Sequence, residues 1–207
     1  MKKFMILVMV TMMALCVSAN AQAALLNFDL ALPDILSNTT GVYSYDATTN
    51  LMSFSATALT ITFDQSTLIP ITNGTYSANF HVDENGNFAG GVDGNDLIIT
   101  GNIGNDYSGI LVAGEINNFG WLVPATGKAW FNYTFDFTEG ALEDYYTSKT
   151  GGDEATSEVS TFTGNFNNSF TGIKTKHDTA PTTPEPSSMV LLGMGILGLF
   201  GLGKKRA

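Results

Sequence analysis

The chain has 207 residues and a formal net charge of −10, a length typical of one domain with processing segments. Residues 24–186 contain four lysines and all 19 acidic residues, a net charge of −15. This acidity argues against nucleic acid and anionic membranes as partners, because both bind clusters of Lys and Arg. The single cysteine, Cys16, precedes this stretch, so no disulfide or thiol chemistry is expected in it.

The chain begins with a predicted signal peptide over residues 1–23. Two lysines precede an apolar run over residues 4–17, and Ala21 and Ala23 stand where a signal peptidase requires small residues. We expect cleavage after Ala23, with cleavage after Ala21 as the second choice. An uncleaved membrane helix is the alternative, but the run is short for a span. The Sec machinery and signal peptidase are therefore expected partners.

Residues 24–173 are predicted to form a β-rich extracytoplasmic domain, because apolar residues alternate along short stretches. Leu59, Ile61 and Phe63 alternate with polar residues, and the opposite parity of residues 52–58 predicts a bend or bulge between the two stretches. The next predicted strand, residues 76–83, places four apolar residues inward: Tyr76, Ala78, Phe80 and Val82.

Glycine-containing turn dipeptides separate these strands. Asn73-Gly74, Asn85-Gly86 and Asp93-Gly94 fit type I′ hairpin turns, whose central residues both need positive φ. Oxygen-bearing side chains around two of them are candidate calcium ligands: Asp83, Asn85, Asn87, Asp93, Asn95 and Asp96. The spacing lacks the glycine and glutamate of an EF-hand loop. Turn formation is therefore the preferred interpretation, no cofactor is expected, and calcium is the alternative.

Three further strands are predicted after these turns. Residues 97–99 and 110–113 are apolar on both faces, which is typical of central strands. Residues 130–137 alternate most clearly, with four aromatic residues on the inward face: Phe131, Tyr133, Phe135 and Phe137. Short strands punctuated by tight turns predict an all-β fold, either an antiparallel β-sandwich or a flattened barrel.

The remainder of this region is predicted to be less regular. Residues 139–149 are the one helical candidate, and residues 149–158 are predicted to be a polar, acidic loop. Residues 160–170 are predicted to form a glycine-containing strand. Residues 174–183 are polar and then proline-rich, which favours a linker.

Catalytic signals are sparse, so the protein is not expected to be an enzyme. His81 has no partner motif and His177 falls in the predicted linker, so zinc is not expected either. Glu139, Glu143 and Asp144 offer paired carboxylates of the kind used in glycoside hydrolysis, but a solvated acidic face accounts for them equally well. A hydrolase with an unrecognised carboxylate site is kept as an alternative.

Carbohydrate binding is a further alternative, because sugar sites use exposed aromatic faces near amides and carboxylates. Four aromatic residues are candidates, of which Trp130 is favoured as exposed: Trp121, Trp130, Tyr145 and Tyr146.

The C-terminal segment, residues 184–207, has three parts in a fixed order. Pro184-Glu185-Pro186 is followed by a glycine-rich apolar run over residues 187–203 and then by Lys204-Lys205-Arg206. As a helix the 17-residue run would rise about 25 Å, which predicts a single short transmembrane span. The basic cluster is expected to stay cytoplasmic, and the prolines on the outer side.

This order closely resembles the PEP-CTERM sorting signal, with Pro184, Glu185 and Pro186 as the matching positions. Thr183 replaces the Val common before the motif, and Ala207 follows the basic cluster. The resemblance implies recognition by an exosortase in the inner membrane of a Gram-negative bacterium that makes exopolysaccharide. It also implies cleavage near the motif and delivery to the cell surface or extracellular matrix. A generic tail anchor would not account for Pro-Glu-Pro.

Together these features predict an exported surface or matrix protein, first anchored in the inner membrane, with a structural or adhesive role in the envelope, biofilm or exopolysaccharide matrix. Its expected partners are an exosortase and exopolysaccharide, and not nucleic acid. A secreted carbohydrate- or calcium-binding module is the main alternative.

Overall fold

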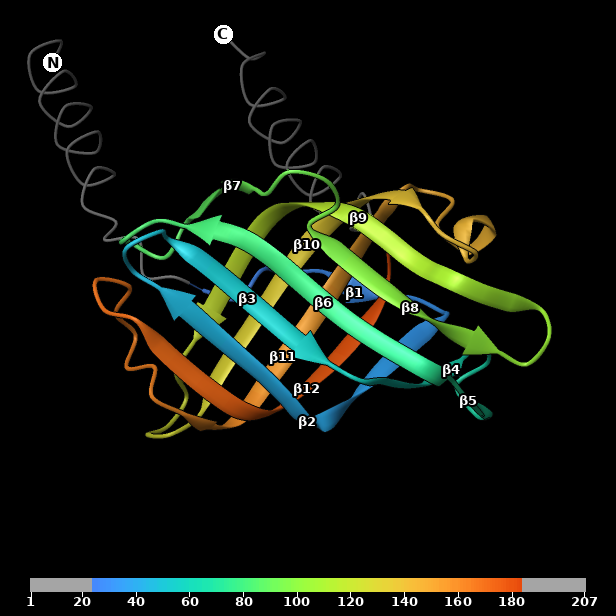
Figure 1. Ribbon diagram of the computed structural model, residues 1–207, viewed down its shortest axis with the longest axis horizontal. Helices are drawn as coiled ribbons and strands as arrows, with labels where there is room; N and C mark the ends of the chain where they lie inside the picture. Colours follow the sequence, from blue (N-terminus) through green and yellow to red (C-terminus); the bar gives the residue numbers. More distant parts are fainter. Residues whose placement is uncertain (1–23, 184–207) are drawn as a thin grey trace, which may run out of the picture.

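The computed structural model describes residues 24–183, which form a closed eight-stranded β-barrel with short accessory strands (Figure 1). The predicted signal peptide, residues 1–23, and the predicted sorting segment with its transmembrane span, residues 184–207, lie outside the described residues. Within residues 24–183, no helix is both long enough and apolar enough to cross a membrane. The prediction of an all-β domain is confirmed.

The barrel strands follow one another in chain order: β2 (Asp34–Asp46), β3 (Leu51–Ala56), β6 (Thr72–Val82), β8 (Leu97–Ile103), β9 (Tyr107–Leu122), β10 (Ala129–Glu139), β11 (Thr150–Ser160) and β12 (Phe170–Thr183). Each strand is antiparallel to the next. β12 also pairs with β2, from Phe170 opposite Tyr45 to Thr179 opposite Ile35. This pairing closes the sheet and leaves no free edge in the barrel. Of the two predicted architectures, the barrel is therefore observed and the sandwich is not.

Four short strands lie beside the barrel strands. β1 (Asp29–Leu30) pairs with the end of β12, and β7 (Phe88–Gly91) pairs with β6. β4 (Ala58–Thr62) pairs with β2, and β5 (Leu68–Pro70) pairs with β4. In Figure 1, β3, β6 and β8 cross in front of β10, β11 and β12 at an angle, as the tilted strands of a barrel do.

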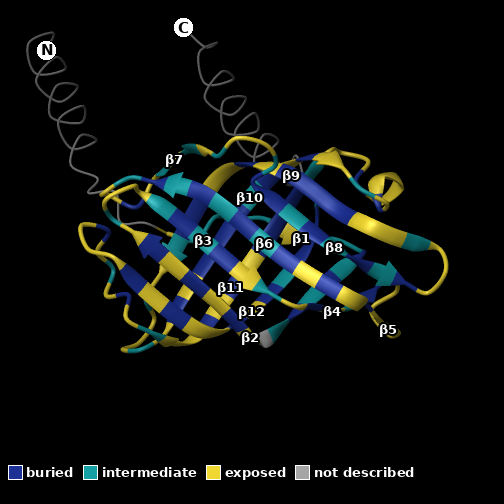
Figure 2. Ribbon diagram, viewed as in Figure 1, coloured by how far each residue is buried: buried dark blue, intermediate teal, exposed yellow. Residues whose placement is uncertain are grey.

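Alternating side chains fill the barrel interior. The inward faces predicted for β6 and β10 are confirmed, because every residue assigned to them is buried. Buried and exposed positions alternate along the strands in Figure 2. Aromatic rings dominate this core, and pairs such as Phe54–Phe131 and Phe80–Tyr133 contact one another at centroid distances of 5.7 and 5.6 Å. A barrel of eight strands is narrow enough for side chains to fill it.

The predicted bend before β4 is confirmed, but the hairpin turn predicted at Asn73-Gly74 is wrong. Thr57 separates β3 from β4, and Leu59 lies outside the core with 42% of its surface exposed. Asn73-Gly74 lies inside β6, where the register with β8 shifts between Thr72 and Thr75. The dipeptide therefore forms an irregularity within a strand rather than a hairpin turn, because positive φ at Asn73 also suits a bulge.

The C-terminal third differs most from prediction. The helical candidate forms only a 3₁₀ turn at Glu143–Tyr145, and the predicted loop at 149–158 is strand β11. Residues 161–169 form a loop where a strand was predicted, and the predicted linker at 174–183 belongs to β12. The physical reason is that inward positions on β11 and β12 are often polar, so the apolar alternation that marks a strand is missing from the sequence.

An N-terminal segment crosses the outer wall of β9, β10 and β11 before entering the barrel. Asn132 holds it, because its Oδ1 accepts a hydrogen bond from Leu26 N at 2.9 Å and its Nδ2 donates to Leu26 O at 2.8 Å. Gly120 and Gly152 lie directly beneath, where a Cβ would overlap the segment's backbone or the ring of Phe28. This segment brings Ala24 and Leu25 to one end of the barrel.

Candidate functional site

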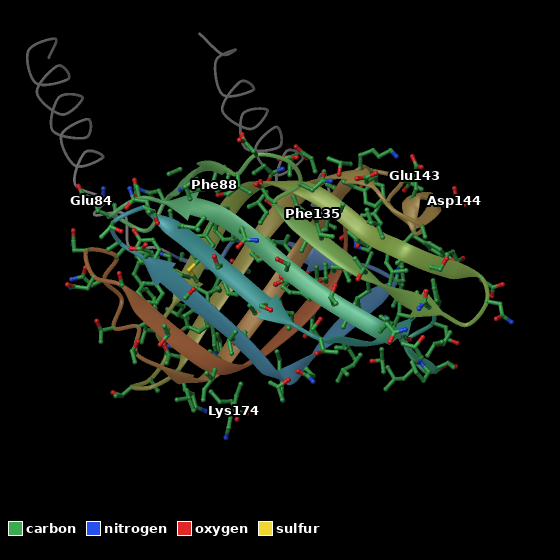
Figure 3. The ribbon with its side chains drawn as sticks, viewed as in Figure 1. Glu84, Phe88, Phe135, Glu143, Asp144 and Lys174 are labelled. Atoms are coloured by element: carbon green, nitrogen blue, oxygen red, sulfur yellow. The ribbon has the colours of Figure 1, made fainter. Side chains whose placement is uncertain are left out.

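One end of the barrel contains a pocket of about 770 Å³, here called the Trp121 pocket. The turn between β6 and β7, the end of β9, the loop at 161–169 and the N-terminal segment enclose it: its lining is Ala24, Leu25, Glu84, Asn85, Trp121, Leu122, Val123, Gly164, Asn165, Phe166 and Asn167. Figure 3 shows Glu84 at one end of the molecule, with Glu143 and Asp144 toward the other. The pocket therefore draws its residues from four separate segments.

Packing fixes the indole of Trp121. Phe162 meets the indole edge to face at a centroid distance of 5.2 Å, and Phe166 packs at 5.4 Å. Gly86 lies against the indole nitrogen, where a Cβ would overlap Nε1, and Gly164 leaves ordinary van der Waals space beside the six-membered ring. These contacts hold the half-buried indole at the mouth of the barrel in one orientation.

Hydrogen bonds within two turns make the pocket rim rigid. Asp83 Oδ1 accepts from Asn85 N at 2.9 Å and from Asn87 N at 2.8 Å. Asn165 Oδ1 accepts from both nitrogens of Asn167, at 2.7 Å from the backbone and 3.0 Å from the side chain. Partial burial raises the pKa of Asp83, but the hydrogen bonds from Asn87 and Asn85 outweigh it and leave the pKa below its ordinary value. The Asp83 carboxylate is thus a turn acceptor.

Three of the other calcium candidates, Asn87, Asn95 and Asp96, take part in hydrogen bonds. Asp96 is 1% exposed, and its two carboxylate oxygens accept from Val92 N at 2.6 Å and Ile116 N at 2.8 Å. Asn95 donates to Glu139 and accepts from Thr138. Asn87 Nδ2 donates to Asp83, and Asp93 is exposed in the turn before β8. Across residues 24–183, no three carboxylate, imidazole or thiol groups are arranged to hold a metal ion, so Asp83, Asp93 and Asp96 do not form such a group.

The carboxylates considered for hydrolysis lie at the far end of β10 and in the 3₁₀ turn. Glu139 accepts the hydrogen bond from Asn95, and Glu143 forms an ion pair with Lys149 at 2.5 Å in which both side chains are exposed. His81 Nδ1 lies 3.2 Å from Thr49 O. None of these contacts brings an imidazole and a carboxylate together.

The aromatic candidates for sugar binding have different environments. Trp130 is 41% exposed on the outer wall, as expected, and Tyr145 is 38% exposed. Tyr146 is fully buried and stacks on Phe137 at 4.8 Å, so it belongs to the core. Of the four, only Trp121 lines the pocket.

A second group of polar side chains, here called the His177 cluster, lies inside the barrel. His177 and Asp153 have no exposed surface, and His177 Nδ1 lies 3.1 Å from Asp153 Oδ1. Thr179 Oγ1 donates to the other carboxylate oxygen at 2.6 Å, and the ring of Tyr76 packs on His177 at 4.2 Å. Burial, reinforced by the Asp153 carboxylate, raises the pKa of Tyr133 well above its ordinary value.

The His177 cluster was not predicted, because His177 falls in residues 174–183, whose composition favours a linker. The one available signal was the alternation of Thr175, His177 and Thr179 with Lys174, Lys176 and Asp178, which has the period of a strand. Within the described chain, the side-chain nitrogen Nε2 of His177 and the hydroxyls of Tyr76 and Tyr133 are buried without a hydrogen-bond partner.

The predicted sorting residues Pro184, Glu185, Pro186, Lys204, Lys205 and Arg206, and the predicted cleavage residues Ala21 and Ala23, lie outside the described residues. No curated protein and no solved structure matches the chain. A family model described as the PEP-CTERM protein-sorting motif matches residues 182–206, and this match confirms the resemblance drawn from Pro184-Glu185-Pro186 and the basic cluster. The C-terminal end of this chain is therefore a PEP-CTERM protein-sorting motif.

Proposed function

We propose that this protein is a non-catalytic structural or adhesive component of the cell surface or extracellular matrix, and that the barrel is the part delivered there. The observation that carries the proposal is the sorting motif at residues 182–206, which supports export and processing by an exosortase. The signal peptide at residues 1–23 would supply entry through the Sec machinery and signal peptidase. The inner membrane would then be a transient location.

The fold is compatible with a delivery role. β12 ends at Thr183, which pairs with Asp29 of β1, and the motif match begins one residue earlier at Thr182. The sorting motif thus adjoins the folded barrel without a linker. Cleavage near Pro184-Glu185-Pro186 would leave the barrel strands intact, because all of them end before Pro184.

Two features support a non-catalytic role. The one histidine–carboxylate pair in the described chain, His177 with Asp153, has no exposed surface and so cannot meet a substrate from solution. The exposed carboxylate of Glu143 is neutralised by Lys149. A catalytic base or acid must come within hydrogen-bond reach of its substrate. The His177–Asp153 pair is buried, and Glu143 is already paired with Lys149.

The test compares processing of Glu185→Ala and Pro186→Ala with that of the unaltered chain in a Gram-negative host that has an exosortase. We expect both variants to accumulate as precursors in the inner membrane, because the altered residues carry the motif. Intact mass of the protein from outer fractions would fix both cleavage points, with Ala24 as the expected first residue. Thr183→Val, which restores the residue common before the motif, is the matched control and should be processed normally. Normal release of both motif variants would contradict the proposal.

A further inference from the structure

The Trp121 pocket has the size and composition of a small-molecule site. Its volume of about 770 Å³ falls within the range of about 300–1,000 Å³ typical of ligand pockets, which combine apolar walls with a few placed polar groups. Leu122, Val123 and Trp121 supply the apolar wall, and the polar groups lie on the two turns at the rim. The chain therefore presents a concave site whose lining includes two aromatic rings, those of Trp121 and Phe166.

The indole of Trp121 is held in a fixed orientation, on which a flat apolar face of a ligand could stack. Phe162 and Phe166 pack against the indole, and Gly86 allows the β6–β7 turn to approach it closely. A side chain already locked by packing loses little conformational freedom when a ligand stacks on it. The C–H face of a pyranose ring is such a ligand face, because it offers an apolar surface with hydroxyls around its edge.

The rim offers both donors and acceptors for those hydroxyls. Asn165 Oδ1 is occupied by Asn167, so the side-chain amide of Asn165 presents its two N–H donors. The carbonyl oxygen of Asn167 and the carboxylate of Glu84 are acceptors in the same lining. A mixed donor and acceptor set suits neighbouring hydroxyls, each of which both donates and accepts.

The charge of the pocket lining favours uncharged ligands over anionic ones. Glu84 is the only charged residue in the pocket lining, and no Lys, Arg or His takes part in it. In the full-length chain, where the backbone nitrogen of Ala24 is an uncharged amide, a uronic acid, sulfate or phosphate group would therefore meet a carboxylate without a compensating cation, which is unfavourable. An uncharged sugar avoids this repulsion.

We propose that the Trp121 pocket binds one or two neutral sugar rings of a polysaccharide, with the ring face on Trp121 and the hydroxyls on Asn165, Asn167 and Glu84. The proposal rests on the proposed function only for the source of the sugar, which would be the matrix to which the protein is delivered. Ala24 and Leu25 form one wall of the pocket, so the site is completed by the segment that signal-peptide cleavage would leave at the N-terminus.

The chain has two tryptophans, Trp121 and Trp130, which allows a direct test. In Trp130→Phe, tryptophan fluorescence reports Trp121 alone. The full-length variant, kept in a detergent without a sugar headgroup, is titrated with neutral tetrasaccharides of glucose, mannose, galactose and N-acetylglucosamine. We expect a saturable fluorescence change with at least one of them at concentrations up to about 10 mM, within the range of weak specific binding. A tetrasaccharide of galacturonic acid should bind at least tenfold more weakly.

Variants distinguish sugar binding in the Trp121 pocket from nonspecific association of the sugar with other parts of the protein. Calorimetric titration should show at least a tenfold loss of affinity in Trp121→Ala and a several-fold loss in Asn167→Ala. Trp130→Ala, which alters the exposed tryptophan on the outer wall, should keep the affinity. The Asn167 side chain is exposed, so this variant tests the site even if Trp121→Ala fails to fold.

Two results would overturn the proposal: no saturable change with any neutral probe, or equal affinities for Asn167→Ala and the unaltered chain. Both are independent of processing. A protein that binds sugar but is not sorted would contradict the proposed function alone, and a protein that is sorted but binds no neutral sugar would contradict this inference alone.

Discussion

The Trp121 pocket and the His177 cluster both combine aromatic rings with polar side chains, but they differ in what positions them. The His177 cluster comes from neighbouring strands, where register places Asp153 opposite Thr179 and Tyr133. The Trp121 pocket comes from turns and a loop at the barrel end. Strand pairing buries polar groups and brings the Asp153 carboxylate to His177 and Thr179, whereas turns leave polar groups facing solvent. The first arrangement is closed to solvent, and the second is open to it.

The largest expected effect tests the sealed cluster. Asp153→Ala should lower the free energy of unfolding by about 3–5 kcal/mol, because it leaves buried partners of the carboxylate without an acceptor. At about 2–4 °C per kcal/mol, this corresponds to a melting temperature lower by about 6–20 °C. Calorimetry or circular dichroism would measure it.

Two variants control this experiment. Asp153→Asn keeps the size and one acceptor oxygen, so its loss should be clearly smaller. Glu154→Ala removes the next carboxylate along β11, which points outward and is exposed, and should change stability by less than about 0.5 kcal/mol. A loss in Asp153→Ala no larger than that of Glu154→Ala would remove the distinction between the two regions.

The second prediction tests close packing at the open pocket. Gly86 and Gly94 have nearly equal φ, +84° and +83°, but a Cβ would overlap Trp121 at Gly86 and meets nothing within 4 Å at Gly94. Alanine at either position should cost about 1–2 kcal/mol of backbone strain. Gly86→Ala should cost about 1–3 kcal/mol more, because overpacking forces side chains to move. It should also shift the Trp121 fluorescence. Equal losses in the two variants would show that the indole is not held by this turn.

The third prediction uses pH to test the carboxyl group of Asp34, whose pKa the Asp153 carboxylate helps to raise. Burial raises the pKa of Asp34 from 3.8 to about 6, and the carboxylates of Asp178, Asp153 and Glu154 add to the shift. The folded state therefore binds the proton more tightly than the unfolded state. The resulting stability is fully present below about pH 4 and is lost as the pH rises through about 6. As the pH falls from 7.5 to 5, the melting temperature should therefore rise.

Asp34→Asn isolates this contribution. The rise in the pKa of Asp34 from 3.8 to about 6 corresponds to about 3 kcal/mol, which solvent screening of a half-exposed group reduces to about 1 kcal/mol. The variant should therefore be more stable than the unaltered chain at pH 7.5 by about 1 kcal/mol, and the difference should vanish near pH 4. Asp46→Asn is the opposite control, since hydrogen bonds from Thr48 lower the pKa of Asp46 and the variant should not gain stability at pH 7.5. An unaltered chain that loses stability steadily from pH 7.5 to 5 would contradict the assignment.

The smallest expected effect concerns the pocket rim. The Asp83 turn is held by its own amides, so millimolar calcium should raise the melting temperature by less than about 2 °C, and magnesium should act in the same way. A specific site at 100 times its dissociation constant would instead add about 2.7 kcal/mol. A large calcium-specific shift that disappears in Asp83→Asn would make the rim a metal site.

Apolar alternation predicted the strands whose inward positions are apolar. β10 was predicted from Phe131, Tyr133, Phe135 and Phe137, all of which are buried. β11 and β12 were missed because their inward positions include Asp153, Ser157, Thr175 and His177. The aromatic residues of the 161–169 loop were read as a strand, but Phe162 and Phe166 pack against Trp121 and Phe131 at the barrel end.

The candidate site was predictable only in part. Trp121 was among the aromatic candidates for sugar binding, but its partners Glu84 and Asn165 lie 37 and 44 positions away in the sequence. No local pattern connects such residues, because barrel closure brings their segments together. Trp130 was favoured instead, since alternation alone identifies an outward-facing side chain but cannot identify a concave surface.

The sequence by itself determined the C-terminal sorting motif and the all-β character of the domain, because contiguous residues encode both. A sorting signal is recognised along a short segment, and a strand with an apolar inner face shows its period within a few residues. Only the tertiary structure decided that the sheet closes through β12 and β2, that His177 is sealed inside, and that Trp121 opens into a pocket. Each of these depends on contacts between residues far apart in the chain, and the free energy of those contacts is set by packing and burial rather than by local sequence.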